Sequence, residues 1–338
     1  MKVDKYIICW LNVSIVVVFL MIFVGGVTRL TDSGLSMTDW RPVTGILPPL
    51  NQQEWENNFN EYKKFPEFKH YNVNMTLAEY KMIYFWEYLH RILGRLIGLL
   101  FIIPFSFFYF KNYFSREYLY KFLFLFILGG LQGLMGWYMV KSGLINNPDI
   151  SHLRLSVHLS LALIIISYIY WVKVSLLNIH ERKIEYFSYY NNFINIILFF
   201  VFLQIIYGAF SAGLKAGHFW NEYPFINGYY FPRNIFEGES FLNNIIYNPK
   251  VVQLIHRNLA LVVISLIYLF SYNAILNSKE VSIYNNIIYL NLIIFLQFIL
   301  GILTLVSGSS IVFAVTHQFF AVLTVLAILK LKHSLRFY

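Results

Sequence analysis

The stretch Tyr84-Phe-Trp-Glu-Tyr-Leu-His-Arg-Ile-Leu-Gly-Arg95 places a carboxylate, an imidazole and two guanidinium groups inside a run of residues that otherwise suits lipid. Ionisable groups within a membrane-spanning helix are costly, and they usually mark a cavity, a cofactor or an ion path. On a helix, Glu87 and His90 are three residues apart and share one face. The competing interpretation is a helix end whose polar side chains only reach the lipid headgroups.

The same pattern occurs a second time, at Val252-Gln-Leu-Ile-His-Arg257. Within it, His256 and Arg257 correspond to His90 and Arg91. A single helix end gives no reason for the same pair of residue types to recur at matching positions. The repetition therefore favours two related sites within the membrane.

The composition is that of an integral membrane protein, because 58% of the residues are hydrophobic and only 13% are charged. Backbone groups in lipid must be satisfied internally, which favours helices and predicts an all-α fold. The net charge of +9 does not indicate nucleic acid, since the basic residues are scattered among short connections. The single cysteine, Cys9, excludes an intramolecular disulfide and a cysteine-based metal site.

Eight apolar runs are long enough to cross a bilayer, which takes about 20 residues. The first run is longer than a typical signal core and lacks a small-residue cleavage site, so we interpret it as a retained helix. The predicted spans lie at about 6–27, 82–109, 119–140, 152–176, 193–213, 251–272, 284–306 and 311–331.

Lysine and arginine are concentrated in the short connections and at both termini. By the positive-inside rule, these parts face the cytoplasm or the mitochondrial matrix. The two long connections, 28–79 and 214–250, then lie on the opposite side. Their length and aromatic content predict ordered caps over the sites.

The two halves of the chain form a direct repeat. Gln132 with Gly136 is echoed by Gln297 with Gly301. Each half contains an even number of spans, so both have the same orientation, unlike inverted repeats. We therefore predict two tandem four-helix bundles, in residues 1–180 and 181–338.

Four histidines, His90, His158, His256 and His317, fall on the even-numbered spans at similar depth. In an up-down bundle the second and fourth helices are diagonal, so each half can oppose two imidazoles across its core. A single buried histidine is more often a structural residue, but four at matching depth suit two haem irons held from both faces.

Other polar residues near these sites are less specific. Arg91, Arg95, Arg154 and Arg257 could pair with haem propionates or extend to the surface.

The informative difference between the halves is that Glu87 of the first corresponds to Gln253 of the second. A carboxylate can handle protons or stabilise a developing cation, whereas an amide cannot titrate. The first half is therefore interpreted as a reaction chamber, and the second as the site of a fixed redox cofactor.

The motifs together resemble those of the haem A synthase family, and the resemblance covers nearly the whole chain. Because it has no cysteine pair, the chain resembles the cysteine-poor branch of the family, which is found in mitochondria and alphaproteobacteria. The matching segments are Gly25-Gly-Val-Thr-Arg-Leu-Thr-Asp-Ser-Gly-Leu-Ser-Met-Thr-Asp-Trp40, Glu87-Tyr-Leu-His-Arg91, Gln132-Gly-Leu-Met-Gly-Trp137, Arg154-Leu-Ser-Val-His158, Gln253-Leu-Ile-His-Arg257 and His317-Gln318.

The resemblance implies oxidation of the C8 methyl group of haem O to a formyl group, by successive hydroxylations with oxygen from water, giving haem A for cytochrome c oxidase. It implies that His256 and His317 ligate a haem b cofactor. It further implies that His90 and His158 face the substrate haem, with Glu87 nearby.

It also implies an integral protein of the bacterial inner membrane or the mitochondrial inner membrane, in contact with lipid. The implied partners are a haem O synthase that delivers the substrate and an unidentified electron acceptor. A homo-oligomer is possible, and no binding of nucleic acid is expected.

Two other classes fit parts of the pattern. A bis-histidine di-haem cytochrome would only transfer electrons, and it should tolerate loss of Glu87. A transporter would use the intramembrane charges to line a substrate path, and it would carry no haem.

Overall fold

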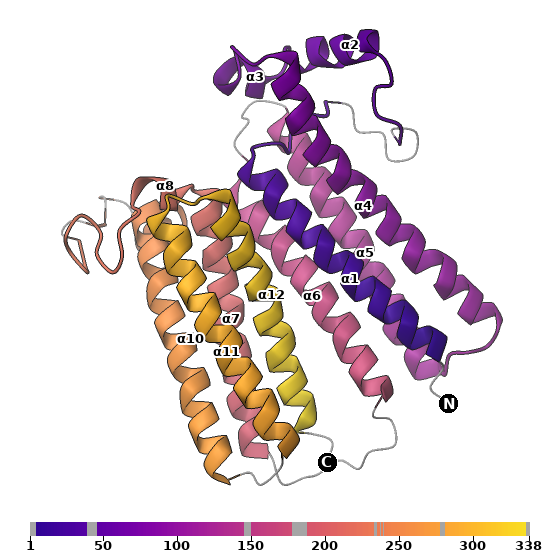
Figure 1. Cartoon of the computed structure of the whole chain (residues 1–338), viewed down its shortest axis with the longest axis vertical. Helices are drawn as coiled ribbons and strands as arrows, with labels where there is room; N and C mark the ends of the chain where they lie inside the picture. Colours follow the sequence, from indigo (N-terminus) through magenta and orange to yellow (C-terminus); the bar gives the residue numbers. More distant parts are fainter. Residues whose placement is uncertain are drawn as a thin grey trace. The chain divides into compact units, whose positions relative to one another are not determined.

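The computed structural model describes residues 5–38, 46–144, 150–177, 188–232, 235–236, 238, 240–277 and 281–335. Within these ranges the chain is helical, and its only bridge of strand type is the isolated pair Ile226 and Tyr229 (Figure 1). The predicted all-α class is confirmed. The helices are α1 (Lys5–Leu30), α2 (Gln52–Tyr62), α3 (Pro66–Tyr71), α4 (Leu77–Phe110), α5 (Arg116–Gly143), α6 (His152–Leu177), α7 (Ser188–Gly213), α8 (Ala216–Phe219), α9 (Phe241–Tyr247), α10 (Pro249–Asn277), α11 (Val281–Val306) and α12 (Ile311–Ser334).

Eight of these helices are long and apolar enough to cross a membrane, namely α1, α4, α5, α6, α7, α10, α11 and α12. They correspond one to one with the eight predicted spans. Helix ends differ from the prediction by up to five residues, at the starts of α4 and α7 and at the end of α10. Helix α4 begins at Leu77 and runs for 34 residues. Its start is fixed by a capping box, in which Thr76 accepts from the Glu79 amide while the Glu79 carboxylate accepts from the Thr76 amide.

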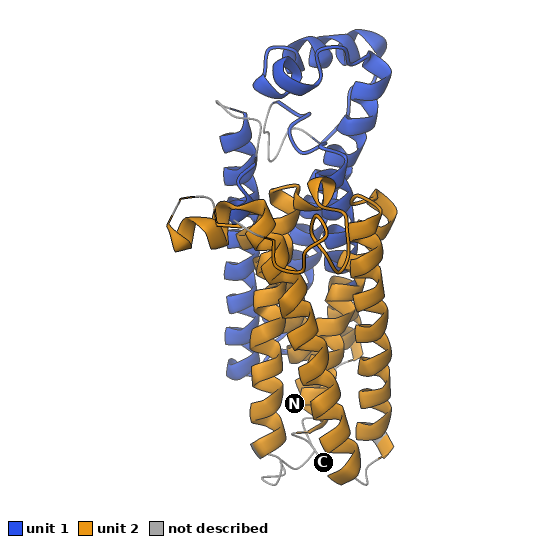
Figure 2. Ribbon diagram, turned by 90° about the vertical axis from the view of Figure 1, so that its left-hand side faces the viewer, with its two compact units in different colours: residues 1, 16–154 blue, residues 2–15, 155–338 orange. Residues whose placement is uncertain are grey.

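Internal contacts divide the chain into two compact units (Figure 2), Val16–Arg154 and Lys2–Ile15 with Leu155–Tyr338. This division separates α6 from the helices that precede it and therefore differs from the sequence repeat. The tandem arrangement of duplicated bundles stays a prediction. Its boundary at residues 180 and 181 lies outside the described residues, as do the extreme termini.

In the first unit, part of the long connection 28–79 folds into α2 and α3, which lie at the N-terminal end of α4 (Figure 1). An aromatic cluster joins them to that helix. Tyr80 of α4 stacks on Phe59 and Tyr62 with ring centroids 5.0 and 5.2 Å apart. Inside the cluster, the Tyr62 hydroxyl donates to Glu67 and accepts from Asn72. The described part of this connection therefore contains ordered helices, and its role as a cap stays a prediction. Trp40 lies outside the described residues.

In the second unit, α7, α10, α11 and α12 form a four-helix bundle. Each helix packs against two neighbours, so that the order around the bundle is α7, α10, α11, α12. One half of the bundle core is filled by aliphatic side chains such as Ile267, Ile287 and Leu331, all fully buried. In this order α10 and α12 are diagonal, and these are the helices that carry His256 and His317.

Candidate functional site

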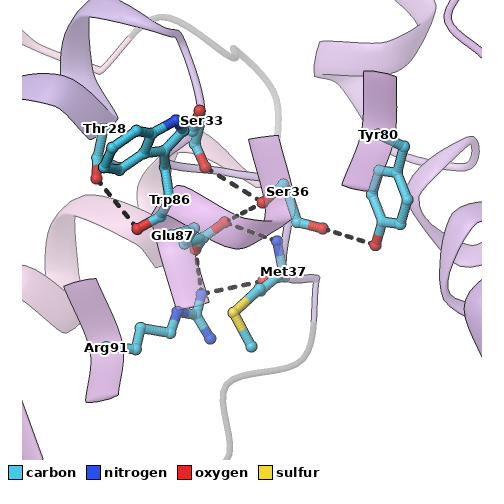
Figure 3. Close-up of polar contacts among 8 residues, drawn as sticks. All are labelled: Thr28, Ser33, Ser36, Met37, Tyr80, Trp86, Glu87 and Arg91. Atoms are coloured by element: carbon cyan, nitrogen blue, oxygen red, sulfur yellow. Dashed lines mark hydrogen bonds and ion pairs between the residues drawn. The ribbon is translucent and has the colours of Figure 1, made fainter. Parts of the chain in front are cut away.

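Glu87 lies on α4 with only 2% of its surface exposed, and both of its carboxylate oxygens are engaged (Figure 3). Oε2 accepts hydrogen bonds from the Ser36 hydroxyl and the Met37 backbone amide, each at 2.7 Å. Oε1 accepts from the Arg91 guanidinium at 2.5 Å, one helical turn further along. Three donors therefore hold a single carboxylate in one place.

The same contacts fasten the segment that follows α1 to the face of α4. Arg91 also donates to the Met37 carbonyl at 3.0 Å, and the Tyr80 hydroxyl donates to the Ser36 carbonyl at 3.2 Å. In the last turn of α1, the Thr28 hydroxyl donates to the Trp86 carbonyl at 3.3 Å (Figure 3). Glu87 is thus the centre of a buried polar junction as well as a candidate reactive group.

The second unit contains the corresponding junction with different chemistry. Gln253 donates from Nε2 to the Trp220 carbonyl at 2.7 Å and accepts from Arg257 through Oε1 at 3.1 Å. Arg257 also donates to the carbonyls of Pro224 and Phe225. The two junctions therefore have the same plan. Arg91 connects Glu87 of α4 to the loop that follows α1, and Arg257 connects Gln253 of α10 to the loop that contains Pro224 and Phe225.

Backbone polarity gives a structural reason for the acid in one half and the amide in the other. The loop presents an N–H group to Glu87, from Met37, and a C=O group to Gln253, from Trp220. A carboxylate can only accept and suits the first loop, whereas the second requires a donor, which an amide provides. Each residue type is matched to its own loop.

The sequence did not identify the loop partners Ser36 and Met37. Both lie in the segment that carries the family motif, so the motif contained the signal, but nothing in it indicated which residue would contact Glu87.

The arginines proposed as propionate partners have other contacts in the structure. Arg91 and Arg257 serve the two junctions, and the Arg154 guanidinium lies over the Tyr138 ring, 4.5 Å from its centroid. The pairing of any arginine with a propionate stays a prediction.

His90 lies on α4, one turn beyond Arg91's partner Glu87, and faces α1. A methyl group placed on Gly25 of α1 would lie 3.1 Å from Nε2 of His90. His158 lies on α6, in the other compact unit. The expected pairing of His90 with His158 therefore stays a prediction.

His256 and His317 come from α10 and α12, which are diagonal helices of one bundle. Each ring lies beside an amide side chain of a neighbouring helix. Nε2 of His256 is 3.4 Å from Nε2 of Gln204 on α7, and Nε2 of His317 is 3.5 Å from Nε2 of Gln297 on α11. Gln204 was not identified from the sequence, because its counterpart in the first half is not a glutamine.

The hydrogen bonds define the tautomer of these histidines. Nδ1 of His317 lies 3.1 Å from the Gln297 carbonyl, which can only accept, so Nδ1 carries the proton. Nε2 is then a lone-pair nitrogen, as a ligand to iron must be. The amide nitrogen of Gln204 beside Nε2 of His256 favours the same tautomer there.

These residues fit a haem with two axial imidazoles. Glycines face both rings, since methyl groups on Gly208 and Gly301 would lie 3.0 and 2.9 Å from Cε1 of His256 and His317. Among the described residues, the buried Oε1 atoms of Gln204 and Gln297 have no hydrogen-bond partner. Opposed neutral imidazoles are the donor set of low-spin haem proteins.

Comparisons with known proteins extend over nearly the whole chain. A sequence model of the COX15-CtaA family, described as cytochrome oxidase assembly protein, matches residues 8–329. The heme A synthase of Pelagibacter ubique (strain HTCC1062) is 42% identical over 319 residues, covering 94% of this chain and 93% of the relative. That of Flavobacterium psychrophilum is 43% identical over 322 residues, covering 94% of both chains. That of Nitrosospira multiformis is 40% identical over 341 residues, covering 99% of this chain and 94% of the relative.

Proposed function

Because the chain belongs to the COX15-CtaA family of cytochrome oxidase assembly proteins, we propose that it is a haem A synthase, which oxidises the C8 methyl group of haem O to a formyl group. Its relatives named heme A synthase support a role in haem A biosynthesis. Its eight apolar helices make it an integral membrane protein, which suits a substrate with a long isoprenoid chain.

The observation that carries the proposal is the buried carboxylate of Glu87 at a position where the second unit has the amide of Gln253. Both junctions hold a loop against a helix, so holding the loop does not by itself require a charge. Only the first half keeps a fixed negative charge, three residues from a histidine expected to face the substrate.

In the second half, His256 and His317 would hold haem b through their Nε2 atoms. When bound, haem b would supply a one-electron redox centre that passes electrons from the substrate site to the electron acceptor. The residues of this half hold the imidazoles in the correct tautomer and surround them with apolar helices.

In the first half, His90 and His158 face the substrate haem O. Each hydroxylation takes one water molecule and releases two electrons and two protons, so that the methyl group becomes a hydroxymethyl group. A second hydroxylation gives a geminal diol, which loses water to leave the formyl group.

Glu87 has two roles open to it in that sequence. It can accept a proton from the attacking water, or its charge can stabilise positive charge that develops as electrons leave the methyl carbon. Its three donors favour the electrostatic role, because a preorganised charge costs no reorganisation during the reaction.

We further propose that the protein lies in a bacterial inner membrane or a mitochondrial inner membrane, with both termini on the cytoplasmic or matrix side. A haem O synthase would deliver the substrate. The alternative function is that of a di-haem cytochrome, which would transfer electrons without modifying either haem covalently.

The test is expression of the chain in cells that make haem O but lack a haem A synthase. Haems are extracted and separated by chromatography. Haem A should appear only when the chain is expressed. Full-length protein with bound haem b and no haem A would contradict the enzyme and favour the cytochrome.

A further inference from the structure

The histidines of the second unit share a backbone contact that the sequence motifs did not reveal. On α7 and on α11, a glutamine is followed four residues later by a glycine, and each glycine faces one of the two histidines. Gly208 faces His256, and Gly301 faces His317. The two contacts are near copies of each other on opposite sides of one bundle.

The distances show how close the rings lie to the backbone. A methyl group on Gly301 would lie 2.9 Å from Cε1 and 3.5 Å from Nδ1 of His317. One on Gly208 would lie 3.0 Å from Cε1 and 3.7 Å from Nδ1 of His256. Carbon atoms pack at about 3.5 to 4.0 Å, so alanine at either position would push the ring away.

The close approach at Gly301 brings the His317 ring to a particular carbonyl. In a helix the Cβ atom points toward the N-terminus, so a side chain at position 301 would cover the turn that contains the Gln297 carbonyl. Without it, Nδ1 of His317 reaches that carbonyl at 3.1 Å. His256 of α10 lies beside Gln204 of α7, with Nε2 of the ring 3.4 Å from the amide nitrogen of Gln204. Within the described residues, Nδ1 of His256 has no hydrogen-bond partner.

We propose that Gly208 and Gly301 are positioning residues for the haem b ligands. Each glycine lets an imidazole rest against a helix backbone, which fixes the ring plane with Nε2 available to iron. At Gly301 the close approach also brings Nδ1 of His317 to the Gln297 carbonyl. This inference rests on the proposed haem b site of the second unit. Neither glycine touches the iron; each acts through its histidine, as partners of metal-bound histidines generally do.

The glycine is not explained by helix stability. Alanine is the better helix former, so on propensity alone Gly208→Ala and Gly301→Ala should stabilise α7 and α11. Gly130, on α5, provides a matched control, because a methyl group there would meet no atom within 4 Å among the described residues. Gly130→Ala should keep the properties of the wild-type protein.

The experiment compares purified, detergent-solubilised wild-type protein with Gly208→Ala, Gly301→Ala and Gly130→Ala. Bound haem b is quantified, and the ferric low-spin signal is recorded by electron paramagnetic resonance, which depends on the orientation of the two imidazole planes. Both test variants should bind haem b about 10- to 100-fold more weakly, which is the usual effect of changing a residue that supports a metal ligand. The haem that remains should show a shifted low-spin signal.

A purely structural role predicts a different result. Then the yield and monodispersity of the variants would fall, while the remaining haem kept the wild-type signal. If Gly301→Ala gives no folded protein, Gly208→Ala carries the test, since its contact is slightly longer.

Wild-type occupancy and an unchanged signal in the folded test variants would overturn the inference and leave the haem b assignment standing. Wild-type protein without haem b would overturn the proposed site itself.

Discussion

The Oε1 atom of Glu87 lies 2.5 Å from the guanidinium of Arg91, and both side chains are buried within one turn of α4. A buried ion pair is held together only when further hydrogen bonds compensate for the loss of hydration. Here Ser36 and Met37 satisfy the second carboxylate oxygen, and the Met37 carbonyl accepts from Arg91. The pair therefore holds the loop against α4, and Glu87 keeps these contacts in any chemical role that it has.

Arg91→Met should destabilise the first unit, because it leaves the Glu87 carboxylate buried without its cation. Removal of one partner of a buried pair costs about 3–5 kcal/mol. The measurement is thermal unfolding of the protein in detergent. Lys121→Met is the matched control, since it breaks the more exposed pair with Glu117, where the cost is at most about 1 kcal/mol. Equal unfolding temperatures for the two variants would show that the junction contributes little.

His256→Ala and His317→Ala should each abolish the low-spin haem b spectrum, because each variant removes one axial nitrogen. We expect bound haem b and haem A production to fall together, as measured on the same membranes by difference spectroscopy and haem extraction. Retention of a complete low-spin spectrum in both variants would show that the axial ligands lie elsewhere.

The two long connections should be accessible from the outer side of the membrane. Asn57 is exposed on α2, and Glu222 is exposed in the second connection. Glu222 is a better site for cysteine than the nearby Asn227, whose backbone φ of 50° disfavours most side chains. In a variant without Cys9, Asn57→Cys and Glu222→Cys should react with an impermeant thiol reagent added outside. Reaction only from the cytoplasmic or matrix side would reverse the topology.

Hydropathy was enough to predict the eight spans, because a membrane helix needs a long apolar run and little else. It placed the start of α4 too late. The first turn of that helix contains Glu79 and other polar residues outside the apolar run, and the capping box at Thr76 was the signal that marked the true start.

The contacts of the candidate residues could not be predicted in the same way. Spacing along the chain placed Glu87 and His90 on one helix face, but Ser36 and Met37, the partners of Glu87, are about fifty residues away in the sequence. Hydrogen bonds between a loop backbone and a helix leave no periodic pattern. The polarity of the loops, which matches the acid to Met37 and the amide to Trp220, is visible only in three dimensions.

Glu87→Gln should separate the structural role of the junction from the chemistry. The amide can keep one acceptor contact, but it leaves Arg91 without its anion and its NH₂ group competes with the donors of Ser36 and Met37. The cost should therefore approach the value of about 3–5 kcal/mol expected for removing one partner of a buried pair. The protein should still fold and bind haem b in the second unit. If the charge acts in catalysis, haem A production should fall by about 10²- to 10⁴-fold, and haem O or its hydroxylated intermediate should accumulate.

Gln253→Glu provides the reciprocal control for this experiment. It places a carboxylate against the Trp220 carbonyl, so it should disturb the second junction and lower bound haem b without acting on the substrate site. Haem b content and the ratio of haem A to haem O are measured on each preparation. A Glu87→Gln variant that loses haem b and folded protein together would assign Glu87 to structure alone. Normal haem A production from a folded Glu87→Gln variant would rule out the catalytic role, because its amide carries no charge and is a poor base.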